Sequence, residues 1–221
     1  MGEENKWAVL PIIERHYRAR YNPSEIFFTV CGGLAHNTFI FAGNLVRMPT
    51  TYILNSAHYT HVLEKVRGVK RALWIGTADI KDLYVNDGLN NTVPFLSLLA
   101  ERMSRGVEVR LIHAKEPGQN FREDFDKYPL LAKRLERALC PRVHFKLMIF
   151  DFECAYIGSA NLTGAGMGMK GENNRNFEAG ILTTEPALVA SAVNQFDEVW
   201  MGKFCEKCGR KAYCGDIIKS I

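Results

Sequence analysis

The sequence predicts an α/β fold, in which short buried strands alternate with amphipathic helices. Apolar runs of strand length stand at residues 72–80, 107–113 and 147–150. Residues 94–104 and 187–200 place apolar side chains at helical spacing. Hydrophobic residues make up 47% of the 221-residue chain and charged residues 24%, a balance typical of a globular protein with a buried core.

The N-terminal part precedes this alternation, and we expect it to form an extension packed on the main domain. Residues 5–20 predict an amphipathic helix that Pro11 starts or interrupts, residues 26–31 a strand, and residues 56–66 a helix. The arginines of the first segment either form a solvated face, which we slightly favour, or contact nucleic acid. The chain then divides into an extension, a central domain and a cysteine-rich tail: residues 1–66, 67–202 and 203–221.

The central domain opens with a strand, a helix and a second strand, at residues 72–80, 94–104 and 107–113. The helix ends at Gly106, because glycine suits the left-handed conformation found after helices. Residues 82–92 predict a polar loop that forms a possible rim of the site. Residues 125–139 predict a second helix with four basic side chains: Lys127, Lys133, Arg134 and Arg137.

Residues 143–178 carry most of the candidate chemistry. His144 and Lys146 lie two positions apart in an apolar run, so on a strand they share a face. A second short strand follows, and beyond its end Ser159 and Asn161 again share a face. An imidazole, a fixed cation and an amide donor are therefore expected to meet at one end of the sheet. Such a set suits an oxyanion with several charges, such as a phosphodiester.

These residues resemble the HKD signature of the phospholipase D superfamily. Three residues have its H-x-K-x4-D spacing: His144, Lys146 and Asp151. Residues 158–161 match its Gly-Ser-x-Asn tail, and Glu178 ends a later Asn-x-Glu, as in the small bacterial nucleases of the superfamily. The resemblance covers roughly residues 71–201 and implies a mixed sheet flanked by helices, with one HKD motif per chain. Asp151 lies at the far end of its strand, where we expect a structural role.

The resemblance further implies catalysis through a covalent phosphohistidine, without a catalytic metal ion. His144 is then the nucleophile or the general acid, and Lys146 and Asn161 bind the phosphate. Ser159 supports the site by hydrogen bonding, and Glu178 holds the histidine in its reactive tautomer. The chemistry is consistent, since a neutral imidazole is a good nucleophile near pH 7 and an imidazolium is a good acid there.

The chain contains a single complete motif. His113 and Lys115 form another H-x-K, but Asn120 stands in place of the aspartate and no Gly-Ser-x-Asn follows. We interpret this second H-x-K as the end of a strand. The resemblance then implies that the second active-site histidine comes from another copy, and we predict a homodimer whose twofold axis runs through the active site.

A glycine-rich loop at residues 162–174 follows Asn161. Lys170 and Arg175 are our candidate substrate-binding residues there, because glycines let a backbone approach a ligand closely. Loop flexibility alone explains the glycines equally well.

The C-terminal tail holds Cys205, Cys208 and Cys214 at C-x2-C-x5-C spacing. Without a secretory signal, disulfides are the less expected use of these thiols. Three ligands do not close a tetrahedral site, so we expect a fourth from upstream, with Cys140 as first choice and Cys31 as second. The spacing resembles the iron–sulfur staple of helicase-associated nuclease domains, and zinc suits four thiolates equally. We therefore expect structural zinc or an iron–sulfur cluster.

Several functions fit this sequence. The net charge of +4 permits a polyanionic partner, and the lack of a spanning apolar run or secretory signal predicts a soluble, cytoplasmic protein. A nuclease acting on DNA or RNA is the leading hypothesis. A phospholipase or phosphatidyltransferase acting on phospholipids is the second, and a non-catalytic nucleic-acid-binding module is the third. Phosphodiester hydrolysis that is lost in His144→Ala separates the module from the enzymes, and liposome binding separates the two enzymes.

Overall fold

The computed structural model describes residues 38–41, 44–47, 49–81, 83–87 and 91–215. Its contacts divide the chain into two units, Met1–Met48 and Pro49–Ile221. In the first unit, strands β1 (Thr38–Phe41) and β2 (Asn44–Arg47) pair antiparallel. The helix and strand predicted before residue 32 lie outside the described residues. The second unit contains the candidate site.

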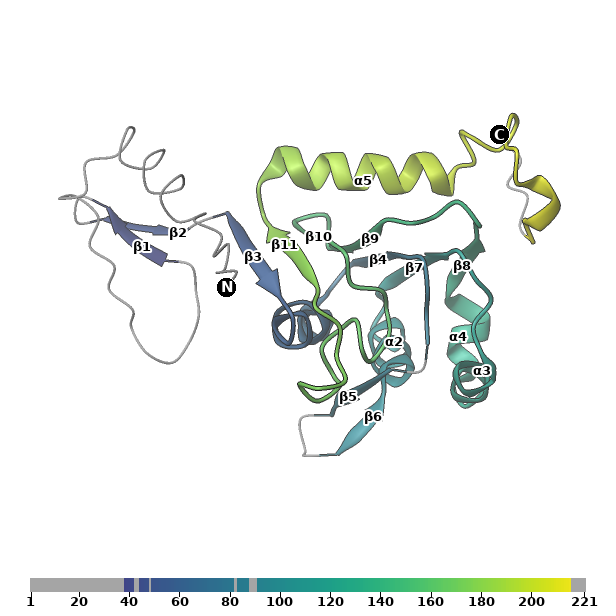
Figure 1. The fold of residues 1–221 in the computed structure, drawn as a ribbon, viewed down its shortest axis with the longest axis horizontal. Helices are drawn as coiled ribbons and strands as arrows, with labels where there is room; N and C mark the ends of the chain where they lie inside the picture. Colours follow the sequence, from purple (N-terminus) through teal and green to yellow (C-terminus); the bar gives the residue numbers. More distant parts are fainter. Residues whose placement is uncertain (1–37, 42–43, 48, 82, 88–90, 216–221) are drawn as a thin grey trace, which may run out of the picture. The chain divides into compact units, whose positions relative to one another are not determined.

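A seven-stranded mixed sheet forms the centre of the second unit, in the order β3-β11-β10-β9-β4-β7-β8 (Figure 1). Its strands are β3 (Thr50–Leu54), β4 (Ala72–Thr77), β7 (Glu108–His113), β8 (Glu136–Leu139), β9 (Lys146–Phe150), β10 (Cys154–Gly158) and β11 (Ala179–Thr183). Strands β4, β7 and β8 run parallel, and the other pairs are antiparallel. The predicted α/β fold with a mixed sheet is confirmed. Strand β3, from the predicted N-terminal extension, is one of the two edge strands of this sheet.

Helices cover both faces of the sheet. The long helix α5 (Pro186–Trp200) lies along one face, and α2 (Phe95–Ser104), α3 (Gln119–Asp126) and α4 (Pro129–Arg134) lie on the other (Figure 1). A turn of π-helix, η2 (His58–Leu63), and a 3-10 helix, η3 (Glu64–Gly68), connect β3 to β4. None of the described helices is both long enough and apolar enough to cross a bilayer.

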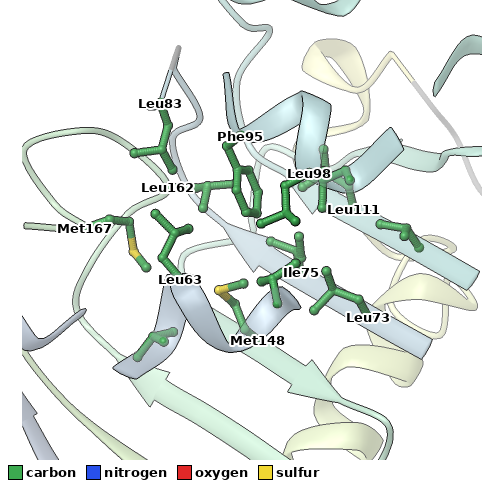
Figure 2. Close-up of a cluster of buried hydrophobic side chains, with 14 of the residues drawn as sticks. Leu63, Leu73, Ile75, Leu83, Phe95, Leu98, Leu111, Met148, Leu162 and Met167 are labelled. Atoms are coloured by element: carbon green, nitrogen blue, oxygen red, sulfur yellow. The ribbon is translucent and has the colours of Figure 1, made fainter. Parts of the chain in front are cut away.

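Alternation along β4 divides the buried side chains into two cores. Leu73 and Ile75 point into the larger core, where they pack with Phe95 of α2 (Figure 2). Trp74 points to the opposite face and stacks on Phe196 of α5, with ring centroids 5.0 Å apart. Since burial of such side chains contributes about 1.5–3 kcal/mol each, both faces of the sheet hold helices in place.

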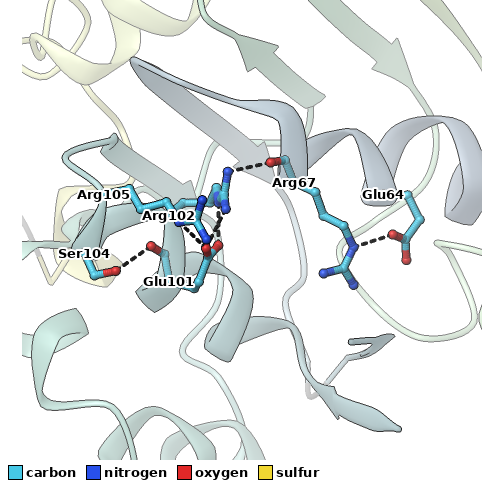
Figure 3. Close-up of polar contacts among 6 residues, drawn as sticks. All are labelled: Glu64, Arg67, Glu101, Arg102, Ser104 and Arg105. Carbon is cyan, nitrogen blue, oxygen red and sulfur yellow. Dashed lines mark hydrogen bonds and ion pairs between the residues drawn. The ribbon is translucent and has the colours of Figure 1, made fainter. Parts of the chain in front are cut away.

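The C-terminus of α2 is built as predicted and also anchors the neighbouring helix. Gly106 has a φ of 92°, and its N–H donates to the carbonyl of Met103 at 3.1 Å. Arg102 is paired with Glu101 and donates through Nη1 to the carbonyl oxygen of Arg67 at 2.5 Å (Figure 3). This bond ties η3 to α2 and so fixes the segment that leads from β3.

The single helix predicted for residues 125–139 is wrong. Helix α3 ends before Pro129, which begins α4, because the residue before a proline is pushed out of the helical conformation. Residues 136–139 then form β8 beside β7. The basic side chains are dispersed as a result: Arg134 donates to the carbonyl of Met103 at 2.6 Å, and Arg137 lies 3.6 Å from the Glu116 carboxylate.

The polar loop predicted for residues 82–92 is in part a hairpin. Strands β5 (Tyr84–Asn86) and β6 (Thr92–Pro94) pair antiparallel, while residues 82 and 88–90 lie outside the described part.

Candidate active site

The candidate residues meet at one edge of the sheet because neighbouring strands begin or end there. Strand β9 begins at Lys146, which pairs with Gly158 at the end of β10. On the far side of β10, β11 begins at Ala179, directly after Glu178. On the other side of β9, β4 ends at Thr77.

Lys146 lies against the imidazole of His144. Its side chain is buried, with the residue 7% exposed, and its Nζ lies 3.4 Å from Nδ1 and 3.5 Å from Nε2 of that ring. Nζ also donates to the His144 carbonyl oxygen at 2.7 Å. Burial lowers the pKa of the Lys146 ammonium group, while the Glu178 carboxylate acts to raise it. His144 itself is exposed and precedes β9, so its predicted place within the strand is wrong although the predicted closeness of the two side chains is confirmed.

Asn161 is held in one orientation by the loop after β4. Its Oδ1 accepts the Asp79 backbone N–H at 3.1 Å and lies 3.4 Å from the Thr77 hydroxyl. The same hydroxyl accepts the Leu162 N–H at 3.1 Å, so the whole turn is tied to the end of β4. The amide NH2 group of Asn161 donates no hydrogen bond to a described residue. It therefore remains available to an oxyanion.

Ser159 and Asn176 fix the carboxylate of Glu178. The Ser159 hydroxyl donates to Oε2, and the Asn176 amide donates to Oε1 at 3.0 Å. The Ala179 N–H donates to the Ser159 hydroxyl oxygen at 3.0 Å, which orients the serine. In the described region, Glu178 forms no hydrogen bond to His144, so its effect on the histidine tautomer stays a prediction.

Asn55 forms a two-bond clamp on Glu178 that sequence reasoning missed. Its N–H donates to the Glu178 carbonyl at 3.0 Å, and its Oδ1 accepts the Glu178 N–H at 3.2 Å. Asn55 adopts a left-handed φ of 47°, which asparagine tolerates better than most residues. The two residues are 123 positions apart. The only sequence signal was a turn-prone asparagine after a strand.

His58 supports this clamp through a hydrogen bond to Asn55. Its Nδ1–H donates to the Asn55 carbonyl at 2.9 Å, and its ring meets Tyr156 edge-on with centroids 5.4 Å apart. Burial lowers the pKa of His58, although the bond to Asn55 and the charge of Glu178 act to raise it. The neutral, fully buried ring thus acts as a fixed support for the residues that hold Glu178.

Asp151 lies at the opposite end of β9 from Lys146. Its carboxylate accepts the backbone N–H groups of Lys70 at 3.0 Å, Arg71 at 2.7 Å and Ala72 at 3.0 Å. Partial burial acts to raise the pKa of this carboxyl group. The hydrogen bonds from the three backbone N–H groups and the charge of Arg71 outweigh this effect, so the pKa lies below its usual value. These contacts give Asp151 the position and partners of a structural residue.

The loop after Asn161 carries the two candidate substrate-binding cations. Lys170 is exposed and Arg175 is half-buried, and neither forms an ion pair with another described residue. Gly168 has a φ of 75°, and a Cβ there would lie 2.7 Å from the Ser56 Cα. This glycine is therefore required by packing against the turn at Asn55, a third explanation that the sequence did not suggest.

The remaining candidates lie apart from this edge or are buried. His113 ends β7, is fully buried and hydrogen-bonds through Nδ1 to the Lys115 carbonyl at 2.6 Å, as expected for a strand end. The four candidate cysteines lie at one corner of the domain: Cys140, Cys205, Cys208 and Cys214. Cys31 lies outside the described residues.

Comparisons with known proteins bear on the fold. The sequence profile described as "Cardiolipin synthase, PLD-like domain" matches residues 71–200. No curated protein sequence matches significantly. Among solved structures, Nuc from Salmonella typhimurium, a phospholipase D family member, has a TM-score of 0.50 at 15% identity, over 68% of this chain and 94% of Nuc.

Two further structures are similar at lower scores. NucT from Helicobacter pylori has a TM-score of 0.49 at 14% identity, over 68% of this chain and 96% of NucT. Phosphatidylserine synthase from Haemophilus influenzae Rd KW20 has 0.47 at 15% identity, over 66% of this chain and 35% of the synthase.

The family profile spans more than half of the chain and includes every residue of the HKD set, from His144 to Glu178. The mixed sheet flanked by helices agrees with the fold of Nuc. The chain therefore belongs to the family of phospholipase D-like domains described for cardiolipin synthase, whose members generally cleave or transfer phosphodiesters.

Proposed function

We propose that the chain is a phosphodiesterase that cleaves DNA or RNA through a covalent phosphohistidine, with an active site shared by two copies. The observation that carries the proposal is the buried Lys146 ammonium group, which lies against the exposed His144 ring. A cation that is fixed beside the attacking atom stabilises the charge on the phosphoryl oxygens without moving during the reaction. The oriented amide of Asn161 adds a second donor.

In the first step, the neutral His144 imidazole attacks phosphorus and a P–N bond forms. The ester P–O bond breaks, and the leaving oxygen takes a proton from the His144 imidazolium of the second copy. In the second step, water attacks phosphorus, the P–N bond breaks, and the water proton returns to the second imidazole. Two displacements of moderate difficulty thus replace one difficult displacement.

Two of the three other described histidines are unsuited to serve as the general acid. His58 and His113 are fully buried, and each hydrogen-bonds to a backbone carbonyl. Neither ring is open to a substrate. The third, His61 of η2, is partly exposed, and its Nδ1 lies 2.9 Å from the hydroxyl of the adjacent Thr60. Because the chain holds a single complete HKD motif, the proposal assigns the general acid to His144 of a second copy, which makes the active enzyme a homodimer.

Exposed groups beside the site favour a nucleic acid as substrate. Phe177 stands between Asn176 and Glu178, and it is 95% exposed. An exposed ring next to a phosphate site offers a stacking surface for a base. Lys170 and Arg175 are not used in ion pairs with described residues and can contact neighbouring phosphates.

A phospholipid substrate is the second candidate, because the matching family profile is described for cardiolipin synthase. The same Lys146 and Asn161 donors serve a phosphatidyl group as well as a nucleic-acid backbone. Cosedimentation with anionic liposomes, together with release of a headgroup, would favour this candidate over the nuclease.

The test is cleavage of single- and double-stranded DNA and RNA, with EDTA added together with the substrate. Wild type and His144→Ala are compared, because most nucleases require a divalent metal and the proposed chemistry does not. We expect cleavage in EDTA and a loss of at least about 10³-fold in the variant. Hydrolysis of a generic phosphodiester without cleavage of any nucleic acid would instead point to the lipid. Without hydrolysis of either, the chain would be a binding module.

A further inference from the structure

Three cysteine side chains line one cavity of about 300 Å³ at a corner of the domain. Cys140 comes from the turn before β9, and Cys205 and Cys208 come from the tail after α5. Cys214 lies next to this cavity, with its Sγ 3.6 Å from the carbonyl oxygen of Leu139, the residue before Cys140. Two segments that are distant in sequence thus bring four cysteines to one corner of the domain.

The tail is docked on the residues that flank Cys140. Arg210 donates through Nη1 to the Pro141 carbonyl at 3.2 Å. Its backbone N–H donates to the Sγ of Cys208 at 3.4 Å, and the Cys208 N–H donates to the Cys205 carbonyl at 3.2 Å. Hydrogen bonds from backbone N–H groups to sulfur orient a cysteine as a ligand and stabilise its thiolate.

Hydrophobic packing does not account for the ordered turns of this tail. Among residues 201–215, Gly202 is the only buried residue, and Tyr213 is 77% exposed. Ordering such a segment costs conformational entropy that burial here does not offset. Cys140, Cys205 and Cys208 form no disulfide with another described cysteine. A cross-link through the cysteines would offset this cost.

We propose that Cys140, Cys205, Cys208 and Cys214 together bind one thiophilic metal centre, either zinc or an iron–sulfur cluster. Four thiolates and no open position make a closed structural site. In the described residues, no three His, Cys, Asp or Glu side chains lie close enough to share an ion. Binding therefore requires the tail to bring its sulfur atoms closer to Cys140, a shift that its exposed position permits.

The metal centre would also fix the turn of the backbone that leads from Cys140 to His144. The walls of the same cavity include Arg142, Val143 and Phe145, which surround His144 in the sequence. A metal on Cys140 would hold this turn at one end while β9 holds it at the other. The proposal is independent of the reaction at His144, because metal binding needs no catalysis.

The first experiment measures metal content on the full chain, purified both aerobically and anaerobically. Zinc and iron are quantified by mass spectrometry, and the protein is then titrated with Co²⁺. We expect one zinc or one cluster per chain, and thiolate-to-cobalt charge-transfer absorption after substitution. Cys140→Ser and Cys208→Ser are expected to lower the metal affinity at least tenfold. Cys154→Ala, a buried cysteine of β10 outside the cavity, is expected to keep it.

Limited proteolysis supplies a readout that is separate from affinity. Trypsin sites at Lys207, Arg210 and Lys211 lie between the proposed ligands. We expect prolonged treatment with a strong chelator to speed cleavage there, and added Zn²⁺ or cluster reconstitution to restore protection. Folding of every variant is checked by circular dichroism.

Two results would overturn the proposal. One is a folded wild type that holds neither metal under either purification and shows no thiolate absorption with Co²⁺. The other is a Cys140→Ser variant with full metal content, in particular if Cys31→Ser loses the metal instead. A wild-type protein that binds the metal but has no nuclease activity would count against the proposed function and would not affect the proposed metal centre.

Discussion

The clearest stability test is Asp151→Asn. The Asp151 Oδ1 atom accepts the Arg71 and Ala72 N–H groups at 2.7 and 3.0 Å, and Oδ2 accepts the Lys70 N–H at 3.0 Å. Asparagine tolerates the left-handed φ of 54° and keeps one acceptor, but its NH2 group meets the Lys70 N–H as a second donor. The variant thus removes the charge and the bond from Lys70 to Oδ2, while it keeps the longer contact of 3.2 Å between the Lys70 N–H and Oδ1 and the backbone conformation.

Hydrogen bonds to a charged group contribute about 1.5–3 kcal/mol each, and neutral ones about half of that. The Lys70 and Arg71 amides are exposed and can bind water, while the Ala72 amide is partly buried. We therefore take the low end and expect Asp151→Asn to lower the free energy of unfolding by about 1–1.5 kcal/mol near pH 7. Asp151→Gly removes every acceptor, and we expect a loss of about 2–3 kcal/mol.

The pH dependence follows from the lowered pKa of Asp151 in the folded chain. Its contribution is fully present above the unfolded value of about 3.9 and is lost as the pH falls through the folded pKa. Urea unfolding followed by circular dichroism should show the full difference between wild type and Asp151→Asn at neutral pH. The difference should shrink below about pH 4.

A matched control is Glu153→Gln, which removes the exposed ion pair with Arg71 at 2.7 Å. It should change stability by no more than about 0.5 kcal/mol. The reasoning is wrong if Asp151→Asn is as stable as wild type at pH 7, or if the difference persists unchanged in acid. A folded Asp151→Asn protein without activity would show that Asp151 acts in the reaction.

Three further changes probe the active-site edge. Lys146→Met keeps the side-chain length but removes the charge. Steady-state kinetics should show that kcat falls by about 10²–10³-fold. An unchanged kcat would show that Lys146 does not stabilise the charge of the transition state. Asn55→Gly keeps the left-handed backbone but removes the side-chain hydrogen bond to Glu178. We expect the free energy of unfolding to fall by about 1 kcal/mol and kcat to fall about tenfold. No change in either quantity would show that the clamp is dispensable. Gly158→Ala places a Cβ 2.8 Å from the Ala179 carbonyl oxygen in the sheet, and the melting temperature should fall by several degrees; a wild-type melting temperature would refute this packing.

Most of the sheet was predictable because its central strands are short apolar runs, as at residues 147–150 and in β4. The HKD residues were predictable because they lie within 35 positions of one another, from His144 to Glu178, and because strand ends bring them together. The homodimer, the nuclease activity and the metal centre stay predictions.

The errors and omissions have physical causes. The segment after α3 was predicted as a single helix because basic and apolar residues alternate there, although Pro129 signals the break. Asn55 and His58 were missed because their contacts with Glu178 and Tyr156 depend on tertiary pairing of β3 with β11. No local pattern encodes such a pairing between residues more than one hundred positions apart.

The central claim is that His144 forms a covalent bond to phosphorus. The most direct measurement incubates the chain with a phosphate-labelled oligonucleotide in EDTA, denatures it at alkaline pH, and looks for label on the protein. We predict an acid-labile adduct that peptide mapping places on His144 and that is absent from His144→Ala. Cleavage in EDTA without an adduct, or an adduct that persists in His144→Ala, would contradict the account.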